Sequence, residues 1–271
     1  MQGIKHFIPT SDKIEFINLL LDVGFDTIDF GSFVSPKAVP QMKDTAEVLS
    51  KLDLSSTNSK LLAIVANLRG ANDACEFEEI SYLGFPFSIS ETFQQRNTNS
   101  SIEKAFENVM EIQDLCISNK KELVIYISMA FGNPYGDDWN ADIALEWANK
   151  MAESDIKTIS LADTVGVAEP KDIKYMLSNL IPEFDGIEFG VHLHTTPNNW
   201  QEKVAAAYEN GCLRFDSAMK GFGGCPMADD DLTGNLASEN LKTYLSEQND
   251  LPALKEDRFN LAMQKAMQLM G

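Results

Sequence analysis

Two histidines stand two positions apart in the segment GVHLHTT, residues 190–196, and the whole 271-residue chain holds only three. In a β-strand alternate side chains point to the same face, so His192 and His194 would present both imidazoles on one side. Such a pair can share a divalent ion, with oxygen ligands completing about six positions around Mg²⁺ or Mn²⁺. The spacing alone equally allows polar packing and ordinary hydrogen bonding of the two rings.

A glycine-rich segment, GFGGCPMADDDLTGN, follows at residues 221–235. Its composition predicts a mobile loop that carries a single thiol, that of Cys225. This cysteine could act as a nucleophile or as an acid–base group, and Asn235 offers a carbonyl oxygen to a metal ion. The alternative is an exposed loop with an incidental cysteine. We interpret the three consecutive aspartates at 229–231 as a solvated acidic turn.

Two further segments place polar groups where predicted strands end. LADTVGV, residues 161–167, puts Asp163 at a strand end, where a carboxylate could be a base, a support for a neighbouring site or a helix cap. DFGSFVSPKAVPQM, residues 29–42, is a proline-punctuated loop that carries Lys37. This loop could embrace the tail of a substrate or form a rigid connection.

Short β-rich runs alternate with amphipathic helical patterns along the chain. We predict seven strands, over residues 25–33, 60–67, 83–90, 122–130, 156–163, 187–195 and 213–220. Strand–helix alternation predicts parallel strands, hence a doubly wound sheet or a (β/α)₈ barrel. In both folds ligands bind at the carboxyl ends of the strands, where the polar residues of this chain gather.

The absence of a GxGxxG or GxxxxGK[ST] motif lowers the case for a doubly wound nucleotide-binding sheet. We therefore favour a TIM barrel that forms a single domain over residues 1–271. The region from about residue 235 onward is expected to form helices that close this domain.

The composition is that of an ordinary globular protein, with 44% hydrophobic and 23% charged residues. A formal net charge of −19 argues against nucleic acid or an anionic membrane as the main partner. No apolar run approaches the roughly 20 residues that span a bilayer, and the start of the chain does not resemble a secretory signal. We expect a cytoplasmic protein whose cysteines are free thiols, namely Cys75, Cys116, Cys212 and Cys225.

Four segments, in the same order along the chain, closely resemble the 3-hydroxy-3-methylglutaryl-CoA lyases: SFVSPKAVPQMKDTAEVL, SLADTVGV, VHLHT and GFGGCPMADDDLTGNLASENL. These enzymes belong to a wider group of metal-dependent TIM-barrel lyases and Claisen-type synthases. The GGCP loop followed by GN is far more selective than the histidine pair. The resemblance implies a TIM barrel that cleaves 3-hydroxy-3-methylglutaryl-CoA to acetyl-CoA and acetoacetate, a reaction of leucine catabolism and ketone-body formation.

The resemblance also implies roles for individual residues. His192, His194 and Asn235 would hold a divalent metal ion, Mg²⁺ or Mn²⁺, and Cys225 would protonate the enolate of acetyl-CoA. Two carboxylates match acidic positions that line the active site of the family, and we expect them to be catalytic: Asp163 and Asp29. The lyases carry Glu where this chain has Asp29.

The expected partners are an acyl-CoA substrate and further copies of the chain, in a homodimer or larger homo-oligomer. The residues that we expect to bind the substrate lie on two loops, and they are Ser32, Lys37, Gly223 and Gly224.

The chain departs from the lyases at three places. The family has a first strand ending in an Arg-Asp pair, of which the Asp is a metal ligand, and Met1 lies after that point. We therefore expect a barrel without its first strand, from a misassigned or truncated start; a shortened, non-catalytic homologue is the alternative. Thr195 replaces an Asp that often follows the second histidine, and the acidic stretch ADDD is one residue longer. A condensing enzyme or aldolase acting on a 2-oxo acid is the other alternative, against which the GGCP loop argues.

Overall fold

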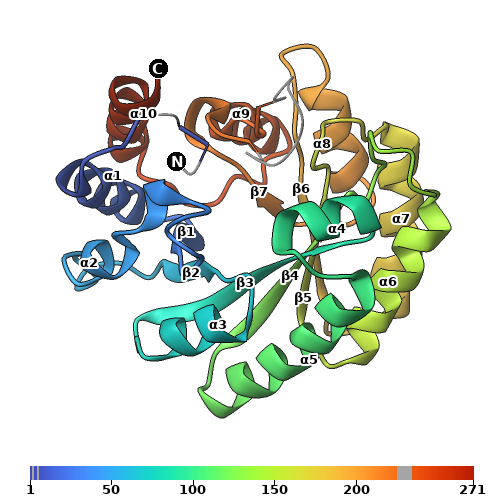
Figure 1. The fold of residues 1–271 in the computed structure, drawn as a ribbon. Helices are drawn as coiled ribbons and strands as arrows, with labels where there is room; N and C mark the ends of the chain where they lie inside the picture. Colours follow the sequence, from blue (N-terminus) through green and yellow to red (C-terminus); the bar gives the residue numbers. More distant parts are fainter. Residues whose placement is uncertain (2, 5, 225–233) are drawn as a thin grey trace.

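The computed structural model describes residues 1, 3–4, 6–224 and 234–271. In this part of the chain one sheet of parallel strands, hydrogen-bonded in sequence order, occupies the centre of the molecule (Figure 1). Each strand overlaps one of the seven strands predicted above. They are β1 (Thr27–Ser32), β2 (Lys60–Ile64), β3 (Ile80–Ser88), β4 (Glu122–Ser128), β5 (Thr158–Ala162), β6 (Glu188–His192) and β7 (Arg214–Asp216).

Helices connect successive strands and surround the curled sheet, which gives the α/β half-barrel expected of a TIM-barrel protein (Figure 1). Within the described residues β1 and β7 are the edge strands of this sheet. No described helix is long and apolar enough to cross a membrane. The helices are α1 (Thr10–Val23), η1 (Pro40–Met42), α2 (Thr45–Leu49), α3 (Leu68–Cys75), α4 (Glu91–Thr98), α5 (Ile102–Ser118), α6 (Ala141–Glu153), α7 (Pro170–Glu183), α8 (Trp200–Tyr208), η2 (Met219–Gly221), α9 (Ser238–Glu247) and α10 (Glu256–Met270).

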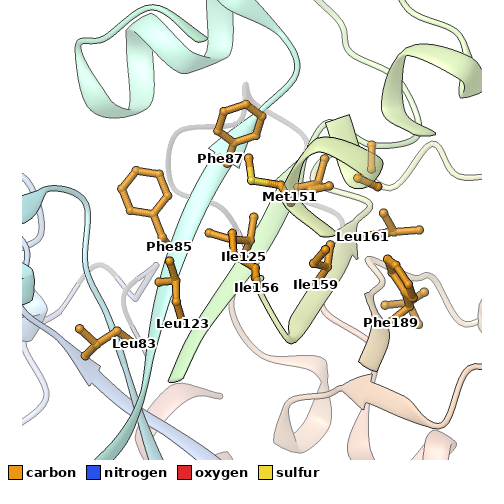
Figure 2. Packing of buried hydrophobic residues seen from close by; sticks show 14 of the residues in the cluster. Leu83, Phe85, Phe87, Leu123, Ile125, Met151, Ile156, Ile159, Leu161 and Phe189 are labelled. Atoms are coloured by element: carbon orange, nitrogen blue, oxygen red, sulfur yellow. The ribbon is translucent and has the colours of Figure 1, made fainter. Parts of the chain in front are cut away.

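The main core lies between the outer face of the sheet and the helices (Figure 2). The parallel register places Phe85 beside Ile125, Ile125 beside Ile159, and Ile159 beside Phe189, so that one apolar row crosses four strands. Met151 of α6 packs against this row from the helix layer (Figure 2). Each fully buried side chain of this size contributes about 1.5–3 kcal/mol relative to an exposed one.

The inner face of the sheet changes character along the strands. Near the amino ends, Leu62, Tyr82 and Val124 form a small buried apolar cluster. Toward the carboxyl ends, the register aligns His192 of β6 with Asp216 of β7. The sheet therefore offers an apolar floor and a polar rim, and the rim is the edge where parallel α/β folds bind ligands.

The last strand is shorter than predicted, since β7 ends at Asp216 and not near residue 220. Beyond it, the backbone N–H of Ala218 donates to the carbonyl of Leu236 at 2.9 Å. The chain here pairs with residues 234–237 and not with the sheet. This pairing brings the segment that contains Asn235 to the carboxyl end of β6.

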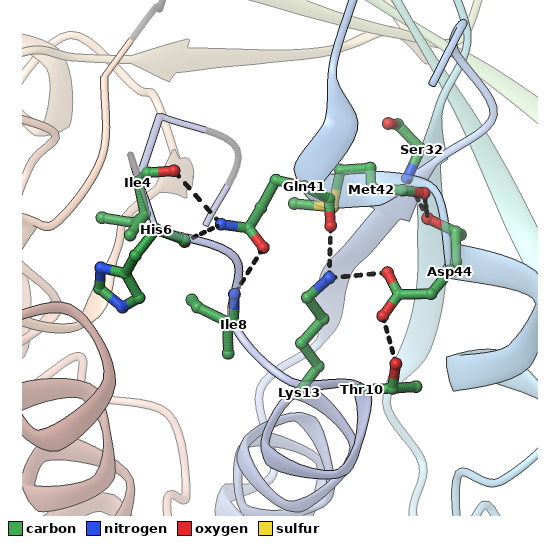
Figure 3. Close-up of polar contacts among 10 residues, drawn as sticks. Ile4, His6, Ile8, Thr10, Lys13, Ser32, Gln41, Met42 and Asp44 are labelled. Atoms are coloured by element: carbon green, nitrogen blue, oxygen red, sulfur yellow. Dashed lines mark hydrogen bonds and ion pairs between the residues drawn. The ribbon is translucent and has the colours of Figure 1, made fainter. Parts of the chain in front are cut away.

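The loop that follows β1 is fixed by a buried lysine of α1 (Figure 3). The Lys13 ammonium lies 2.6 Å from Asp44 Oδ1 and also donates to the backbone carbonyl of Gln41. The hydroxyl of Thr10 donates to the other carboxylate oxygen of Asp44 at 2.7 Å. Both oxygens of this buried carboxylate thus have partners, which offsets the cost of removing it from water.

The side chain of Gln41 secures the same loop from the other side (Figure 3). Its amide nitrogen donates to the carbonyls of His6 at 2.7 Å and Ile4 at 3.2 Å, and its oxygen accepts the N–H of Ile8 at 2.9 Å. All the polar groups of this buried amide are engaged. Of the two interpretations of residues 29–42, these contacts favour the rigid connection.

Candidate metal site

The first ring of the histidine pair is held by a carboxylate of the neighbouring strand. His192 Nδ1 lies 3.2 Å from Asp216 Oδ2, because the parallel register sets the two residues side by side. The ring of Tyr126 meets the His192 ring edge-on, with 5.9 Å between centroids. A carboxylate on one ring nitrogen fixes the tautomer and orientation of an imidazole whose other nitrogen binds a metal ion.

The second ring lies just beyond the end of β6, where the chain leaves the sheet. His194 is only 3% exposed, and its ring centroid is 5.5 Å from that of His192. The backbone of Thr164, in the turn after β5, is a hydrogen-bonding partner of the His194 ring. The two imidazoles therefore converge, as the spacing of two residues predicts.

Asn235 is placed beside both rings by backbone pairing. The N–H of Thr195 donates to the carbonyl of Gly234 at 2.8 Å, and the N–H of Leu236 donates to that of Leu193 at 2.9 Å. The Asn235 side-chain nitrogen donates to the carbonyl of Phe222 at 3.0 Å, which leaves the amide oxygen for the imidazoles. Both histidine rings have the Asn235 side chain as a hydrogen-bonding partner.

The two imidazoles differ in their readiness to take a proton. Burial, and then the proximity of His192, lower the pKa of His194 to about 4, so this ring is neutral at physiological pH. Burial also opposes protonation of His192, but the carboxylates of Asp216 and Asp29 outweigh it and raise its pKa. His194 is therefore a neutral imidazole, with one N–H and one lone pair, and His192 is polarised by carboxylates.

Asp29 lies on the inner face of β1 and remains exposed to water. Partial desolvation by the surrounding protein raises its pKa to about 7; the positive charge of the Met1 amino group opposes this rise, and the carboxylate of Asp216 adds to it. Access to water screens these effects. A carboxyl group of this kind changes protonation state near neutral pH.

The donor set fits a hard or borderline divalent cation. Two imidazoles and one amide group, from His192, His194 and Asn235, lie together at the rim, and a set of nitrogen and oxygen ligands of this kind suits Mg²⁺, Mn²⁺ or Zn²⁺. Across residues 1–224 and 234–271, apart from positions 2 and 5, no three His, Cys, Asp or Glu side chains form a metal-binding group by themselves. Among the described residues, the third protein ligand would therefore be the amide oxygen of Asn235.

Asp163 lies at the end of β5, as predicted, but both of its oxygens have partners. Oδ1 accepts the backbone N–H of Ala168 at 2.9 Å, and Oδ2 lies 2.6 Å from the ammonium of Lys203. The carboxylate is fully buried. This arrangement suits a group that holds the structure around the rim.

The predicted substrate-binding residues are distributed around the rim. Ser32 ends β1, and its buried hydroxyl has no hydrogen-bonding partner in the described structure. Lys37 is exposed on the following loop. Gly223 and Gly224 both have positive φ, and a Cβ on Gly223 would come within 3.0 Å of the Asn235 side-chain nitrogen.

The thiols are consistent with the expectation of free cysteines. Cys75, Cys116 and Cys212 form no disulfide, and all three lie away from the rim on helices or on the approach to β7. Cys225 and the aspartates at 229–231 fall outside the described residues.

Two residues of the site were not found from the sequence, namely Asp216 and Lys203. Asp216 belongs to the last predicted strand, and its carboxyl-end position was the available signal. Lys203 lies in α8, and no pattern in the neighbouring sequence indicates that its ammonium is buried. Both act through residues distant in sequence, which only the pairing of the strands and the packing of the helix bring close.

Comparison with known proteins identifies similar chains. A family model described as HMGL-like matches residues 1–268. Mouse mitochondrial hydroxymethylglutaryl-CoA lyase is 33% identical over 249 residues, covering 91% of this chain and 75% of that protein. The Bacillus subtilis hydroxymethylglutaryl-CoA lyase YngG is 30% identical over 251 residues, covering 93% and 83%. A structure of an HMG-CoA lyase from Acinetobacter baumannii, in complex with coenzyme A and 3-methylmalate, superposes with a TM-score of 0.91 at 29% identity, covering 99% and 87%.

The geometry predicts that the two rim histidines titrate in different pH ranges. In metal-free protein labelled with ¹⁵N-histidine, NMR should show the His192 ring protonating above its ordinary pKa and the His194 ring staying neutral until about pH 4. Asp216→Asn should lower the pKa of His192, because the imidazolium loses its carboxylate. The His6→Gln variant removes the NMR signals of the third histidine, so that the remaining signals belong to His192 and His194. Protonation of His194 above pH 6, or an unchanged His192 in Asp216→Asn, would contradict the geometry.

Proposed function

Because the chain belongs to the HMGL-like family, we infer that it cleaves 3-hydroxy-3-methylglutaryl-CoA to acetyl-CoA and acetoacetate. It is a carbon–carbon lyase with an acyl-CoA substrate. The main support for this inference is that His192, His194 and Asn235 lie together at the rim. The chain also shares 33% sequence identity with a hydroxymethylglutaryl-CoA lyase. The Acinetobacter protein is in complex with coenzyme A, which supports an acyl-CoA substrate for this chain.

The reaction is a retro-Claisen scission. A base takes the proton of the tertiary hydroxyl, a carbonyl forms at that carbon, and the bond to the thioester methylene breaks. The electron pair of that bond becomes the enolate of acetyl-CoA, which then takes up a proton. When bound, a divalent ion would supply Lewis-acid polarisation of the hydroxyl and carboxylate oxygens of the substrate. We propose that His192, His194 and Asn235 hold this ion.

We propose Asp29 as the group that handles the hydroxyl proton. Its pKa of about 7 lets it accept and return a proton near neutral pH, and it is exposed on the inner face of β1. The charge network of Asp29, Asp216 and His192 would buffer the charge that develops during cleavage. Asp163 is fully buried and ion-paired with Lys203, which supports a holding role for it.

We propose Cys225 as the proton donor to the enolate, on the basis of the GGCP sequence alone. Ser32 and Lys37 are proposed to bind the acyl-CoA. The unpartnered hydroxyl of Ser32 is suited to the substrate carboxylate or hydroxyl, since a buried hydroxyl without a partner is costly. An exposed lysine is suited to the anionic tail in a chain whose net charge is −19.

We propose Mg²⁺ or Mn²⁺ as the divalent ion, because imidazole, amide and substrate oxygens together make a set of mainly hard ligands. We also propose a cytoplasmic location; one rat relative is named as a cytoplasmic lyase, although other relatives are named as mitochondrial. The homo-oligomer expected from the sequence stays a prediction.

The function is tested by acetoacetate release from 3-hydroxy-3-methylglutaryl-CoA, measured for this chain and for a form extended upstream in frame. We expect release that requires Mg²⁺ or Mn²⁺ and stops with EDTA. Cys225→Ala should lower turnover by roughly 100-fold or more, the scale of an acid–base group, without loss of bound metal. If neither form releases acetoacetate, the proposed function is wrong.

Gly223→Ala tests the metal site through its third ligand. An alanine Cβ would lie 3.0 Å from the Asn235 side-chain nitrogen, at a backbone φ of 98°, so the amide must shift from its present position. We expect the dissociation constant for Mn²⁺, measured by isothermal titration calorimetry, to rise about 10-fold or more.

The matched control is Gly136→Ala. Gly136 also has a positive φ, 78°, but a Cβ there would meet no atom within 4 Å. Both variants strain the backbone, and only Gly223→Ala should weaken Mn²⁺ binding. Equal affinities in the two variants would exclude Asn235 from the ligand set.

A further inference from the structure

Lys203 is a fully buried cation on α8 that contacts two segments of the rim, the turn after β5 and the end of β6. Its ammonium donates to Asp163 Oδ2 at 2.6 Å, to the carbonyl of Gly166 at 3.0 Å and to the carbonyl of His194 at 3.0 Å. An ammonium has three N–H donors, and each has an acceptor here. The residue is 1% exposed.

One of these contacts acts directly on the backbone of a proposed metal ligand. His194 lies beyond the last residue of β6, so the strand ladder between β5 and β6 does not extend to it. On one side its chain is held by the bridge to Asn235. On the other side its carbonyl is held by the Lys203 ammonium.

The contacts of Lys203 with Asp163 and Gly166 support the His194 ring indirectly, through the turn after β5. Asp163 and Gly166 bracket the turn after β5, and the backbone of Thr164 within that turn is a hydrogen-bonding partner of the His194 ring. Lys203 binds both ends of this turn, through the Asp163 carboxylate and the Gly166 carbonyl. One ammonium therefore fixes the main chain of His194 and the support of its imidazole.

We propose that Lys203 is a positioning residue that orients His194 for metal binding. This rests on the metal site of the proposed function. Burying a charged pair gives little net stability compared with apolar residues of the same shape, so packing alone does not explain an ammonium at this place. Its three acceptors all belong to the segments that carry or support one ligand.

The test measures Mn²⁺ binding by EPR titration of free Mn²⁺, which does not depend on catalytic activity. Lys203→Met keeps the length of the side chain and removes its charge and donors. We expect its dissociation constant for Mn²⁺ to rise about 10–100-fold, the effect of removing an outer partner of a metal ligand.

Lys121→Met is the matched control. Lys121 is also buried, and its ammonium holds the carbonyls of Phe77 and Ile80, both at 2.7 Å. It directly precedes β4, at the amino end of the sheet and thus opposite the rim. This variant should lose stability and keep the Mn²⁺ affinity of the wild type.

A second variant covers the case in which Lys203→Met does not fold. Asp163→Asn with Lys203→Met removes both charges, so no buried carboxylate is left unpaired. The carbonyls of His194 and Gly166 still lose their donor, and we expect weakened Mn²⁺ binding in this folded variant. Wild-type affinity in either folded variant would overturn the role of Lys203. Absence of Mn²⁺ binding in the wild type would instead overturn the proposed metal site.

Discussion

The parallel register at the carboxyl ends of β5, β6 and β7 is the constraint on which the site depends. It aligns Ala162, His192 and Asp216 in one row, which sets an imidazole against a carboxylate without any adjustment by loops. A slip of one residue would turn His192 to the opposite face of the sheet. The apolar rows on the outer face, such as Ile125 with Ile159, make such a slip costly, because they would be turned toward the inner face. The packing of the core therefore determines the geometry of the rim.

Beyond the ends of the strands, buried lysines donate hydrogen bonds to backbone carbonyls that have no partner in the sheet. Three lysines are buried in the described part of the chain, Lys13, Lys121 and Lys203, and the ammonium of each donates to at least one backbone carbonyl. Turns leave carbonyl groups without ladder partners, and a long flexible cation can satisfy two of them at once.

Local sequence patterns predicted the strands and helices of this fold well, but they did not predict which residues distant in sequence contact one another. The apolar runs and their spacing gave all seven described strands and the two closing helices, and period two correctly brought the rings of His192 and His194 together. The end of β7 was predicted too far along, because Ala218 pairs with residues 234–237, a contact that no local pattern contains. Asp216 and Lys203 were missed for the same reason. Their chemistry depends on strand register and on which face of α8 is buried, and both are properties of the assembled fold.

The proposed function requires that the two rim imidazoles bind a divalent metal ion. Pulsed EPR of the Mn²⁺-loaded protein, prepared with natural and with ¹⁵N-labelled histidine, measures this directly through the magnetic coupling of ligand nitrogens to the ion. We expect coupling from two imidazole nitrogens, which changes to the ¹⁵N pattern on labelling and falls to one nitrogen in His192→Ala. Bound Mn²⁺ that shows no histidine nitrogen coupling would contradict it.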